Sequence, residues 1–243
     1  MTMKALYDAI FRDIRDNIEN GTYPYQSFLP SESVLVQAYA CSHNTLRRAL
    51  GLLRDQGYVH PVHGKGVRVI YQPVQRASFT VGGIESFKET SERNNFSYAT
   101  EVAALSNVVA DEHIARLTGY AQGDELIYIE RVRRLNGTAA ILDRSYFLKG
   151  IVGDLTAEIA ERSIYDHLEQ DLGIIVAMGK RTITVEPVEK RDAELLDLEG
   201  IDYVAVMTTQ AFNAQGIMFE YTQSRHRPDM FCFRDTAVRE RCR

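Results

Sequence analysis

Two arginines, Arg131 and Arg133, stand two residues apart in the run ERVRRL, a spacing that suits anion binding. In an extended strand alternate side chains lie on one face, so both guanidinium groups would emerge together. Two forked cations side by side match the oxygens of a phosphate group. A solvated strand face, on which these arginines pair with Asp124, Glu130 or Asp143, explains the same pattern. The strand by itself leaves both interpretations open.

Two predicted helix starts suit the same chemistry. Gly82-Gly83 leads through the run GIESFKE into a helix expected near residues 84–93, and free backbone N–H groups at such a start can hold an anion. A flexible linker end followed by an ordinary cap fits equally well. Ser163 opens a second helix, expected over 163–171, where an N-cap is its simplest role. Neither helix start predicts a binding site by itself.

Residues near the N-terminus have the chemistry of a DNA-reading surface. Between Leu29 and Gly66 the sequence predicts a helix over about 32–39, a turn, a second helix over about 43–56 and a glycine-tipped hairpin. Ser31 and Ser42 occupy the N-cap positions of the two helices. This order of elements is that of a winged helix-turn-helix, whose second helix enters the major groove of DNA.

The polar face of the second helix and the hairpin tip carry the candidate DNA contacts. An ordinary amphipathic helix with a solvated polar face explains residues 42–56 when they are taken alone. The capped helix before them and the Gly-Lys-Gly hairpin after them favour DNA binding, because all three features occur together in the required order. The candidate contacts are Ser31, Ser42, His43, Asn44, Thr45, Arg47, Arg48, His63, Gly64 and Lys65.

The rest of the chain must fold so that the candidate residues meet. Apolar residues at three- to four-residue spacing predict a helix over 4–20. Beyond residue 80, hairpins and short helices alternate, which predicts an α+β domain with a mainly antiparallel sheet. We therefore expect a DNA-binding domain at 1–72, a linker at 73–80 and a second domain at 81–243. The expected strands are Tyr58–His60, Val67–Tyr71, Thr100–Val109, Glu125–Leu135, Ala139–Leu148, Ile174–Val188, Tyr203–Asn213, Ile217–Arg225 and Met230–Thr236, with further helices after Asp111 and over Lys190–Leu198.

Composition and charge narrow the class of protein. The 243 residues are 45% hydrophobic and 25% charged, as in ordinary globular proteins, and no apolar run is long enough to span a membrane. The net charge of −5 argues against an indiscriminate nucleic-acid binder, whereas basic residues outnumber the single acid, Asp55, within 42–72. Three cysteines without metal-ligand spacing predict no metal site and favour a reducing cytoplasm. No cofactor is predicted.

The segments LPSE, SHNTLRRAL and GYVHPVHGKG resemble the DNA-binding domain of the GntR family of bacterial transcription regulators, over about residues 4–70. Two positions depart from the family pattern. His43 stands where the family usually has arginine, so a single donor replaces a bidentate contact to guanine. Ser33 stands where many members carry a charged residue that reaches DNA. The resemblance therefore implies DNA binding with an altered operator sequence.

The segments GIESFKE, ERVR, DRSYF, SIY and FEYTQSRHR resemble the effector-binding UTRA domain of the HutC subfamily, and within it the trehalose operon repressors. The resemblance implies a chorismate lyase-like fold in which a helix-entry serine, an R-x-R strand and an S-x-Y motif hold a phosphate. It also implies three sugar-contacting side chains; the first, Asp143, is one methylene shorter than the usual glutamate. The phosphate residues would be Ser86, Phe87, Lys88, Arg131, Arg133, Ser163 and Tyr165, and the sugar residues Asp143, Glu220 and His226.

The resemblance implies a homodimeric repressor of a trehalose uptake operon that binds a palindromic operator and is released by trehalose 6-phosphate. Residues Tyr71 to Ser78 would form the hinge between the domains. Composition and spacing do not separate a disaccharide from a monosaccharide phosphate, so another sugar phosphate, such as an amino-sugar phosphate, stays open, as does activation in place of repression. A chorismate lyase-like enzyme is the second class of function, although the sequence shows no activated nucleophile or matched acid–base pair.

Overall fold

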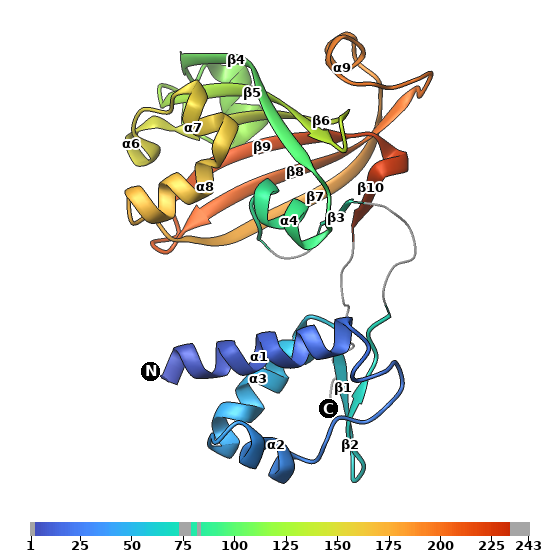
Figure 1. The fold of residues 1–243 in the computed structure, drawn as a ribbon. Coiled ribbons are helices and arrows are strands. Elements are labelled where there is room, and N and C mark those ends of the chain that lie inside the picture. Colours follow the sequence, from blue (N-terminus) through green and yellow to red (C-terminus); the bar gives the residue numbers. More distant parts are fainter. Residues whose placement is uncertain (1–2, 73–78, 82–83, 234–243) are drawn as a thin grey trace, which may run out of the picture. The chain divides into compact units, whose positions relative to one another are not determined.

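The computed structural model describes residues 3–72, 79–81 and 84–233, which fold into two compact units. The first unit contains the described residues up to Gln72, and the second contains those from Phe79 to Phe233 (Figure 1). Most of the expected hinge and the Gly82-Gly83 helix entry lie outside the described residues. Among the described helices, none is long and apolar enough to cross a membrane.

The first unit contains three helices followed by a two-stranded antiparallel hairpin, as the sequence predicted. Its first and third helices each bury an apolar stripe, and its second helix buries Leu35. Ile10, Ile14 and Ile18 of the first helix recur at four-residue spacing and pack with Leu46 and Leu53 of the third. Burial of each such side chain contributes about 1.5–3 kcal/mol. The elements are α1 (Met3–Glu19), α2 (Glu32–Ala38), α3 (His43–Asp55), β1 (Val59–Val62) and β2 (Gly66–Val69).

Local sequence explains where these elements begin and turn. The hydroxyl of Ser31 accepts a hydrogen bond from the backbone N–H of Val34 at the start of α2. The hydroxyl of Ser42 accepts one from the N–H of Thr45 at the start of α3. Gly64, with φ +70°, occupies the left-handed region that the tip of the β1–β2 hairpin requires. The second helix and the hairpin therefore hold their predicted polar residues on short, well-defined elements.

The second unit is built on a six-stranded sheet whose neighbours are all antiparallel, in the order β4-β5-β6-β9-β8-β7. This arrangement confirms the predicted α+β class. The turn between the second and third strands is formed by Asn136 and Gly137, both with positive φ, as their sequence predicted. The strands are β4 (Tyr98–Val109), β5 (Glu125–Leu135), β6 (Thr138–Leu148), β7 (Val176–Pro187), β8 (Tyr203–Asn213) and β9 (Met218–His226).

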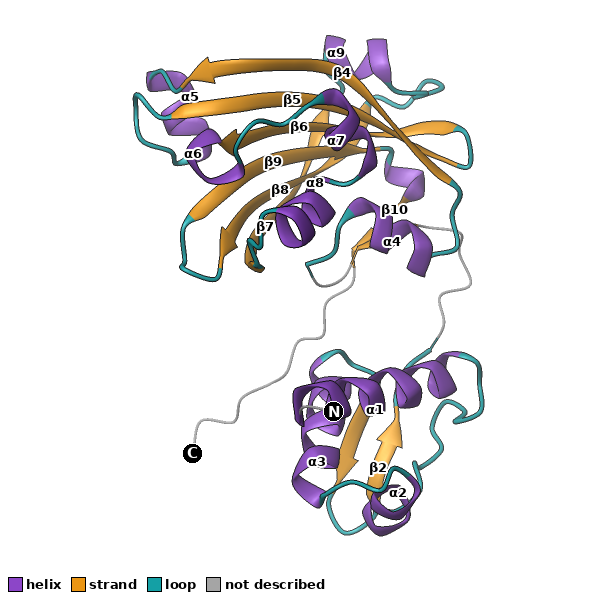
Figure 2. Ribbon diagram, turned by 60° about the vertical axis from the view of Figure 1, so that its left-hand side comes forward, coloured by secondary structure: helices purple, strands orange, loops and turns teal. Residues whose placement is uncertain are grey.

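Several short helices surround this sheet, and Figure 2 shows α4, α7 and α8 in front of one of its faces. Two of them, α6 and α7, fall in residues 149–162, where the sequence predicted no element, because helices of four and six residues are too short for a periodic pattern. The helices are α4 (Phe87–Arg93), α5 (Glu112–Thr118), α6 (Lys149–Val152), α7 (Ala157–Arg162), α8 (Ile164–Asp166), which continues as a π-helical turn over His167–Asp171, and α9 (Lys190–Leu195).

Several boundaries differ from the sequence prediction; most shift by one to three residues, as at α9, which ends at Leu195 instead of Leu198. Helix α4 begins at Phe87 instead of residue 84, because Ser86 and Glu89 form a reciprocal capping box at its start. Phe79 and Thr80, assigned above to the linker, belong to strand β3 (Phe79–Val81), which pairs in parallel with β10 (Phe231–Phe233). Met230 ends a 3-10 turn instead of starting the last strand, and the residues predicted to continue that strand beyond 233 lie outside the described part.

Candidate functional site

A cavity of about 110 Å³ lies between one face of the large sheet and the starts of α4 and α8. The sheet brings its charged residues together, because Arg131 of β5 pairs in register with Asp143 of β6, and Asp143 pairs with Ser224 of β9. Except for Glu220, every effector residue predicted from the sequence lines this cavity. These residues are Ser86, Phe87, Lys88, Arg131, Arg133, Asp143, Ser163, Tyr165 and His226.

Arg133 is held in place on three sides. Its Nε donates to Asp143 Oδ2 at 2.8 Å, and its Nη1 donates to Thr100 Oγ1 at 2.8 Å. The ring of Phe87 lies 4.6 Å from its guanidinium carbon, a cation–π contact. The side chain is therefore oriented before any ligand enters, which lowers the entropic cost of binding.

Arg131 makes fewer hydrogen bonds than Arg133. Its Nη2 lies 3.4 Å from Ser145 Oγ and 3.8 Å from Asp143 Oδ2. Its buried Nε has no hydrogen-bond partner among the described residues. Burial and the neighbouring Arg133 lower the pKa of Arg131 to about 10, so it stays charged at neutral pH. A buried cation with an unused donor is suited to an incoming anion.

Asp143 is the carboxylate that both arginines share. Its Oδ1 accepts a hydrogen bond of 2.6 Å from Ser224 Oγ, in addition to the contact of Oδ2 with Arg133. Burial alone would raise the pKa of Asp143, but Arg133, Arg131 and the Ser224 hydroxyl together lower it below its ordinary value. The group is therefore ionised, and the cavity contains a fixed negative charge beside its two central cations.

Two helix starts face the same cavity. Ser86 caps α4 and Ser163 caps α8, each hydroxyl accepting a backbone N–H three residues later. Lys88 Nζ, in the first turn of α4, lies 3.0 Å from Asp166 Oδ2 of α8 and so ties the two helices together. This end of the cavity is electrostatically suited to an anion.

Glu220 is not among the residues that line the cavity, but it contacts Tyr165, which is. The hydroxyl of Tyr165 donates to Glu220 Oε2 at 2.7 Å, and the Thr222 hydroxyl lies 2.7 Å from Oε1. Burial raises the pKa of both Tyr165 and Glu220. The structure thus places Glu220 where it orients Tyr165, a residue predicted on the phosphate side, and not where the sequence predicted a sugar contact.

His226 lines the cavity and is neutral at physiological pH. Burial lowers the pKa of His226 to about 4, although the charge of Asp143 opposes this shift. Its ring lies 4.5 Å from that of Phe231, centroid to centroid. Its Nε2 is buried and has no hydrogen-bond partner among the described residues. A neutral imidazole with an unused nitrogen is suited to a hydroxyl group.

The lowered pKa of His226 predicts that the second unit loses stability in mild acid. Between pH 6.5 and about 4 the unfolded chain binds a proton at this histidine that the folded chain does not, so unfolding becomes more favourable as pH falls. We expect about 1 kcal/mol of destabilisation per pH unit from this group. Urea denaturation at pH 7.0, 6.0 and 5.0, monitored through the second unit, measures the slope. The variant His226→Gln should show a shallower slope, and an unchanged slope would contradict the assignment.

Sequence reasoning missed two further cations at the cavity, Arg162 and Arg181. Arg162 ends α7 and Arg181 lies on β7, next to Thr209 of β8. Burial lowers the pKa of Arg181. The sequence did not predict them, because neither residue belongs to a motif and a single sequence does not reveal the order of strands in the sheet. Among the described residues, no cluster of His, Cys, Asp and Glu could hold a metal ion.

The predicted DNA contacts divide into two groups in the first unit. His43, Asn44 and Arg47 of α3 are exposed, and so are Ser31, Ser42 and the hairpin tip His63, Gly64 and Lys65. Thr45 is instead buried at 8% exposure, with its hydroxyl 2.9 Å from that of Ser42. Arg48 is exposed but lies over the ring of Tyr7 at 4.2 Å, toward α1.

One carboxylate contacts two residues of the exposed group. Glu32 of α2 accepts from Arg47 Nε at 3.1 Å, and the same Oε2 lies 3.7 Å from His43 Nδ1. Neither contact is buried, so each is worth little as stabilisation. The contacts instead place the Arg47 guanidinium beside His43 on the face of α3 that is directed away from the core.

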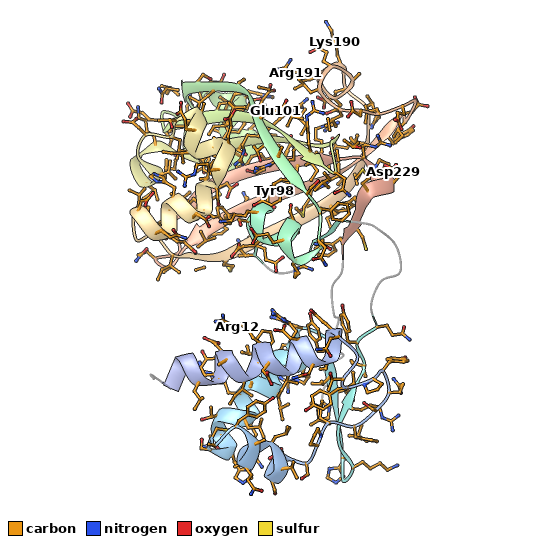
Figure 3. The ribbon with its side chains drawn as sticks, viewed as in Figure 1. Arg12, Tyr98, Glu101, Lys190, Arg191 and Asp229 are labelled. Atoms are coloured by element: carbon orange, nitrogen blue, oxygen red, sulfur yellow. The ribbon has the colours of Figure 1, made fainter. Side chains whose placement is uncertain are left out.

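The opposite face of the large sheet carries a separate set of ion pairs. Arg225 of β9 contacts Asp192 of α9 at 2.8 Å, and both side chains are fully buried. Arg191, labelled on α9 in Figure 3, contacts Glu130 of β5 at 2.8 Å. These pairs dock α9 on the sheet and use none of the cavity residues.

Comparisons with known proteins match both units. The model for bacterial regulatory proteins of the gntR family matches residues 6–69, and the UTRA domain model matches residues 93–232. The HTH-type transcriptional regulator TreR of Bacillus subtilis (strain 168) is 36% identical over 230 residues, covering 95% of this chain and 96% of that protein. The mannosyl-D-glycerate transport/metabolism system repressor MngR of Escherichia coli (strain K12) is 23% identical over the full length of both.

Two solved structures are similar to the chain. The possible transcriptional regulator YydK from B. subtilis superimposes with a TM-score of 0.81 at 22% identity, covering 96% of this chain and 99% of that one, which supports the fold. The effector-binding domain of the B. subtilis trehalose repressor TreR matches with a TM-score of 0.54 at 36% identity, covering 59% of this chain and 99% of that one.

Proposed function

Because the chain belongs to the GntR family of bacterial transcription regulators and carries a UTRA domain, we propose that it represses a trehalose-utilisation operon and is released from DNA by trehalose 6-phosphate. The motif resemblance described above is confirmed at the level of the family. The relative at 36% identity is named as a transcriptional regulator, and we infer that this chain likewise acts as a regulator and not as an enzyme. The effector, the sign of regulation and the homodimer are parts of the proposal.

The observation that carries the proposal is the pair Arg131 and Arg133 beside two helix starts in one cavity. A phosphate group placed there would accept from the unused Nε of Arg131 and from the Arg133 guanidinium. Ser86 and Ser163 line the same cavity; each hydroxyl accepts one backbone hydrogen bond and could donate its proton to the phosphate. The Tyr165 hydroxyl donates to Glu220 and would have to leave that contact before it could donate to a phosphate. Such a site favours a phosphate monoester over a neutral sugar.

The rest of the cavity suits a carbohydrate. Phe87, Phe147 and Met207 supply apolar surface for the C–H faces of a sugar ring, and His226 supplies a buried nitrogen for a hydroxyl. Trehalose is the proposed sugar because the relative at 36% identity is named TreR, and the solved domain of the same identity is that of a trehalose repressor. Another sugar phosphate remains the alternative that the experiment below separates.

Repression requires that the first unit binds DNA and that the effector changes this binding. The exposed residues of α3 would enter the major groove and the hairpin tip would contact the backbone. A homodimer would place two such units on the halves of a palindrome. The effector can release DNA only if it binds better to a conformation with lower operator affinity.

The experiment is an operator gel shift with a panel of effectors. Operator fragments selected from random-sequence DNA by the purified full chain are titrated with trehalose 6-phosphate, glucose 6-phosphate, glucosamine 6-phosphate and free trehalose. We expect trehalose 6-phosphate to release the DNA at the lowest concentration and free trehalose to be inactive, since it lacks the anion. Release by a different sugar phosphate at a lower concentration would mean that this compound, and not trehalose 6-phosphate, is the effector. Failure of every sugar phosphate to release the DNA would remove the proposed control mechanism.

A further inference from the structure

One carboxylate already occupies the anion-binding side of both central arginines. Asp143 Oδ2 lies 2.8 Å from Arg133 Nε and 3.8 Å from Arg131 Nη2. The side chains of Asp143 and of both arginines are at most 10% exposed, so water screens these charges weakly. At the two central arginines an incoming anion therefore meets a fixed negative charge beside the two cations. Further charged residues line the same cavity, namely Glu85, Lys88, Arg162 and Arg181.

The negative charge of Asp143 should weaken the binding of inorganic phosphate more than that of a sugar phosphate. At neutral pH inorganic phosphate is a mixture of a dianion with one hydroxyl and a monoanion with two, and these hydroxyls sit on the charged group itself, so its main interaction with Asp143 is repulsion. A sugar phosphate brings the same phosphate group on a body that carries several hydroxyl donors. Each carboxylate oxygen has two acceptor sites, and the contacts of Asp143 with Ser224 and Arg133 use one per oxygen. Hydroxyl groups can therefore bind to the remaining acceptor sites.

We propose that Asp143 determines specificity by excluding inorganic phosphate, so that only phosphates attached to a hydroxyl-rich body bind tightly. This inference rests on the proposed function, because it concerns the same cavity. The strand register supports it: the pairing of β6 with β5 places Asp143 directly opposite Arg131, and its contact to Arg133 holds it there. The position of Asp143 between the arginines, instead of free in the cavity, distinguishes this role from a simple sugar contact.

The lowered pKa of Asp143 agrees with this role, because burial would raise it but Arg133, Arg131 and Ser224 keep the group ionised. The charge is therefore present at every pH at which the protein is expected to work. Exclusion of inorganic phosphate also matters for a regulator, because a sensor that answered to inorganic phosphate would carry no information about a sugar.

The test compares inorganic phosphate binding by the full chain and by Asp143→Asn, measured by titration calorimetry without DNA. The variant keeps the shape and removes the charge. We expect its dissociation constant for inorganic phosphate to fall by about 10- to 1,000-fold. A neighbouring charge changes the equilibrium for binding a proton by the same range, and we expect a comparable effect on the binding of an anion. The preference for trehalose 6-phosphate over inorganic phosphate should shrink by the same factor or more. Asp143→Glu keeps the charge and should keep the discrimination.

The matched control is Glu130→Gln. Glu130 is the residue before Arg131 on β5, and its buried side chain lies on the opposite face of the sheet, where Arg191 and Tyr128 contact it. This substitution should leave the affinity for inorganic phosphate unchanged. Equal affinities of Asp143→Asn and the wild-type chain for inorganic phosphate would overturn the inference.

Wild-type protein provides a second measurement in case Asp143→Asn does not fold. Inorganic phosphate, glycerol 3-phosphate, glucose 6-phosphate and trehalose 6-phosphate form a series of increasing hydroxyl number. We expect affinity to rise along it, and binding of inorganic phosphate as tight as that of the sugar phosphates would also overturn the inference. Because these titrations contain no DNA, failure of the gel-shift experiment would count against the proposed function alone.

Discussion

Replacement of Arg133 by alanine should strongly weaken the response to the effector and leave operator binding intact. The substitution removes a guanidinium group that Asp143, Thr100 and Phe87 hold in one orientation. Loss of a buried charged partner costs about 2–5 kcal/mol of binding free energy. The effector concentration for half-release in a gel shift should therefore rise by a factor of about 30 or more. The operator affinity in the absence of effector should stay at the wild-type value.

The matched control is Arg134→Ala, the next residue on the same strand. Arg134 pairs with Glu101 at 2.7 Å and is about one-third exposed on the opposite face of the sheet. The control removes the same charge and should leave the effector response unchanged. Thermal unfolding of both variants separates a binding defect from a folding defect, since Arg133→Ala also leaves Asp143 with one cation fewer. Release of DNA by Arg133→Ala at wild-type effector concentrations would place the anion site elsewhere.

Replacement of Arg47 by alanine should weaken operator binding by about 1–3 kcal/mol, which is the cost of one lost base or phosphate contact. The Arg47 side chain is 65% exposed, and within the described residues its only salt bridge is with Glu32. Its loss should therefore leave the fold of the first unit unchanged. Gel shifts at several salt concentrations distinguish the two kinds of contact. A lost phosphate contact reduces the salt dependence, whereas a lost base contact relaxes the preference at one operator position.

Arg12→Ala is the control for Arg47→Ala. Arg12 is exposed on α1, and Figure 3 shows it on the side of that helix directed away from α2 and α3. The two substitutions remove the same charge from the same unit. Equal loss of operator affinity in both would mean that net charge, and not the face of α3, determines binding. An unchanged affinity of Arg47→Ala would remove the assignment of α3 as the reading helix.

Local features of the fold were predictable because their causes lie within a few residues. The caps Ser31 and Ser42 and the apolar stripe of α1 act through neighbours three or four positions away. The Asn136-Gly137 turn needs only its own two residues to adopt positive φ. The helix α7 was not predictable because it has only six residues. The pairing of β3 with β10 was not predictable because the two strands are far apart in the sequence.

The sequence by itself determined which residues carry charge and which face of each element they occupy. The spacing of Arg131 and Arg133 placed them together, and motif resemblance added Ser86, Ser163 and Tyr165. Only the tertiary structure decided their neighbours. The order of β5, β6 and β9 put Asp143 between the arginines and Ser224, and a strand from the sheet edge brought Arg181 to the same cavity. Contacts across strands depend on sheet order, and sheet order is set by the packing of the whole domain.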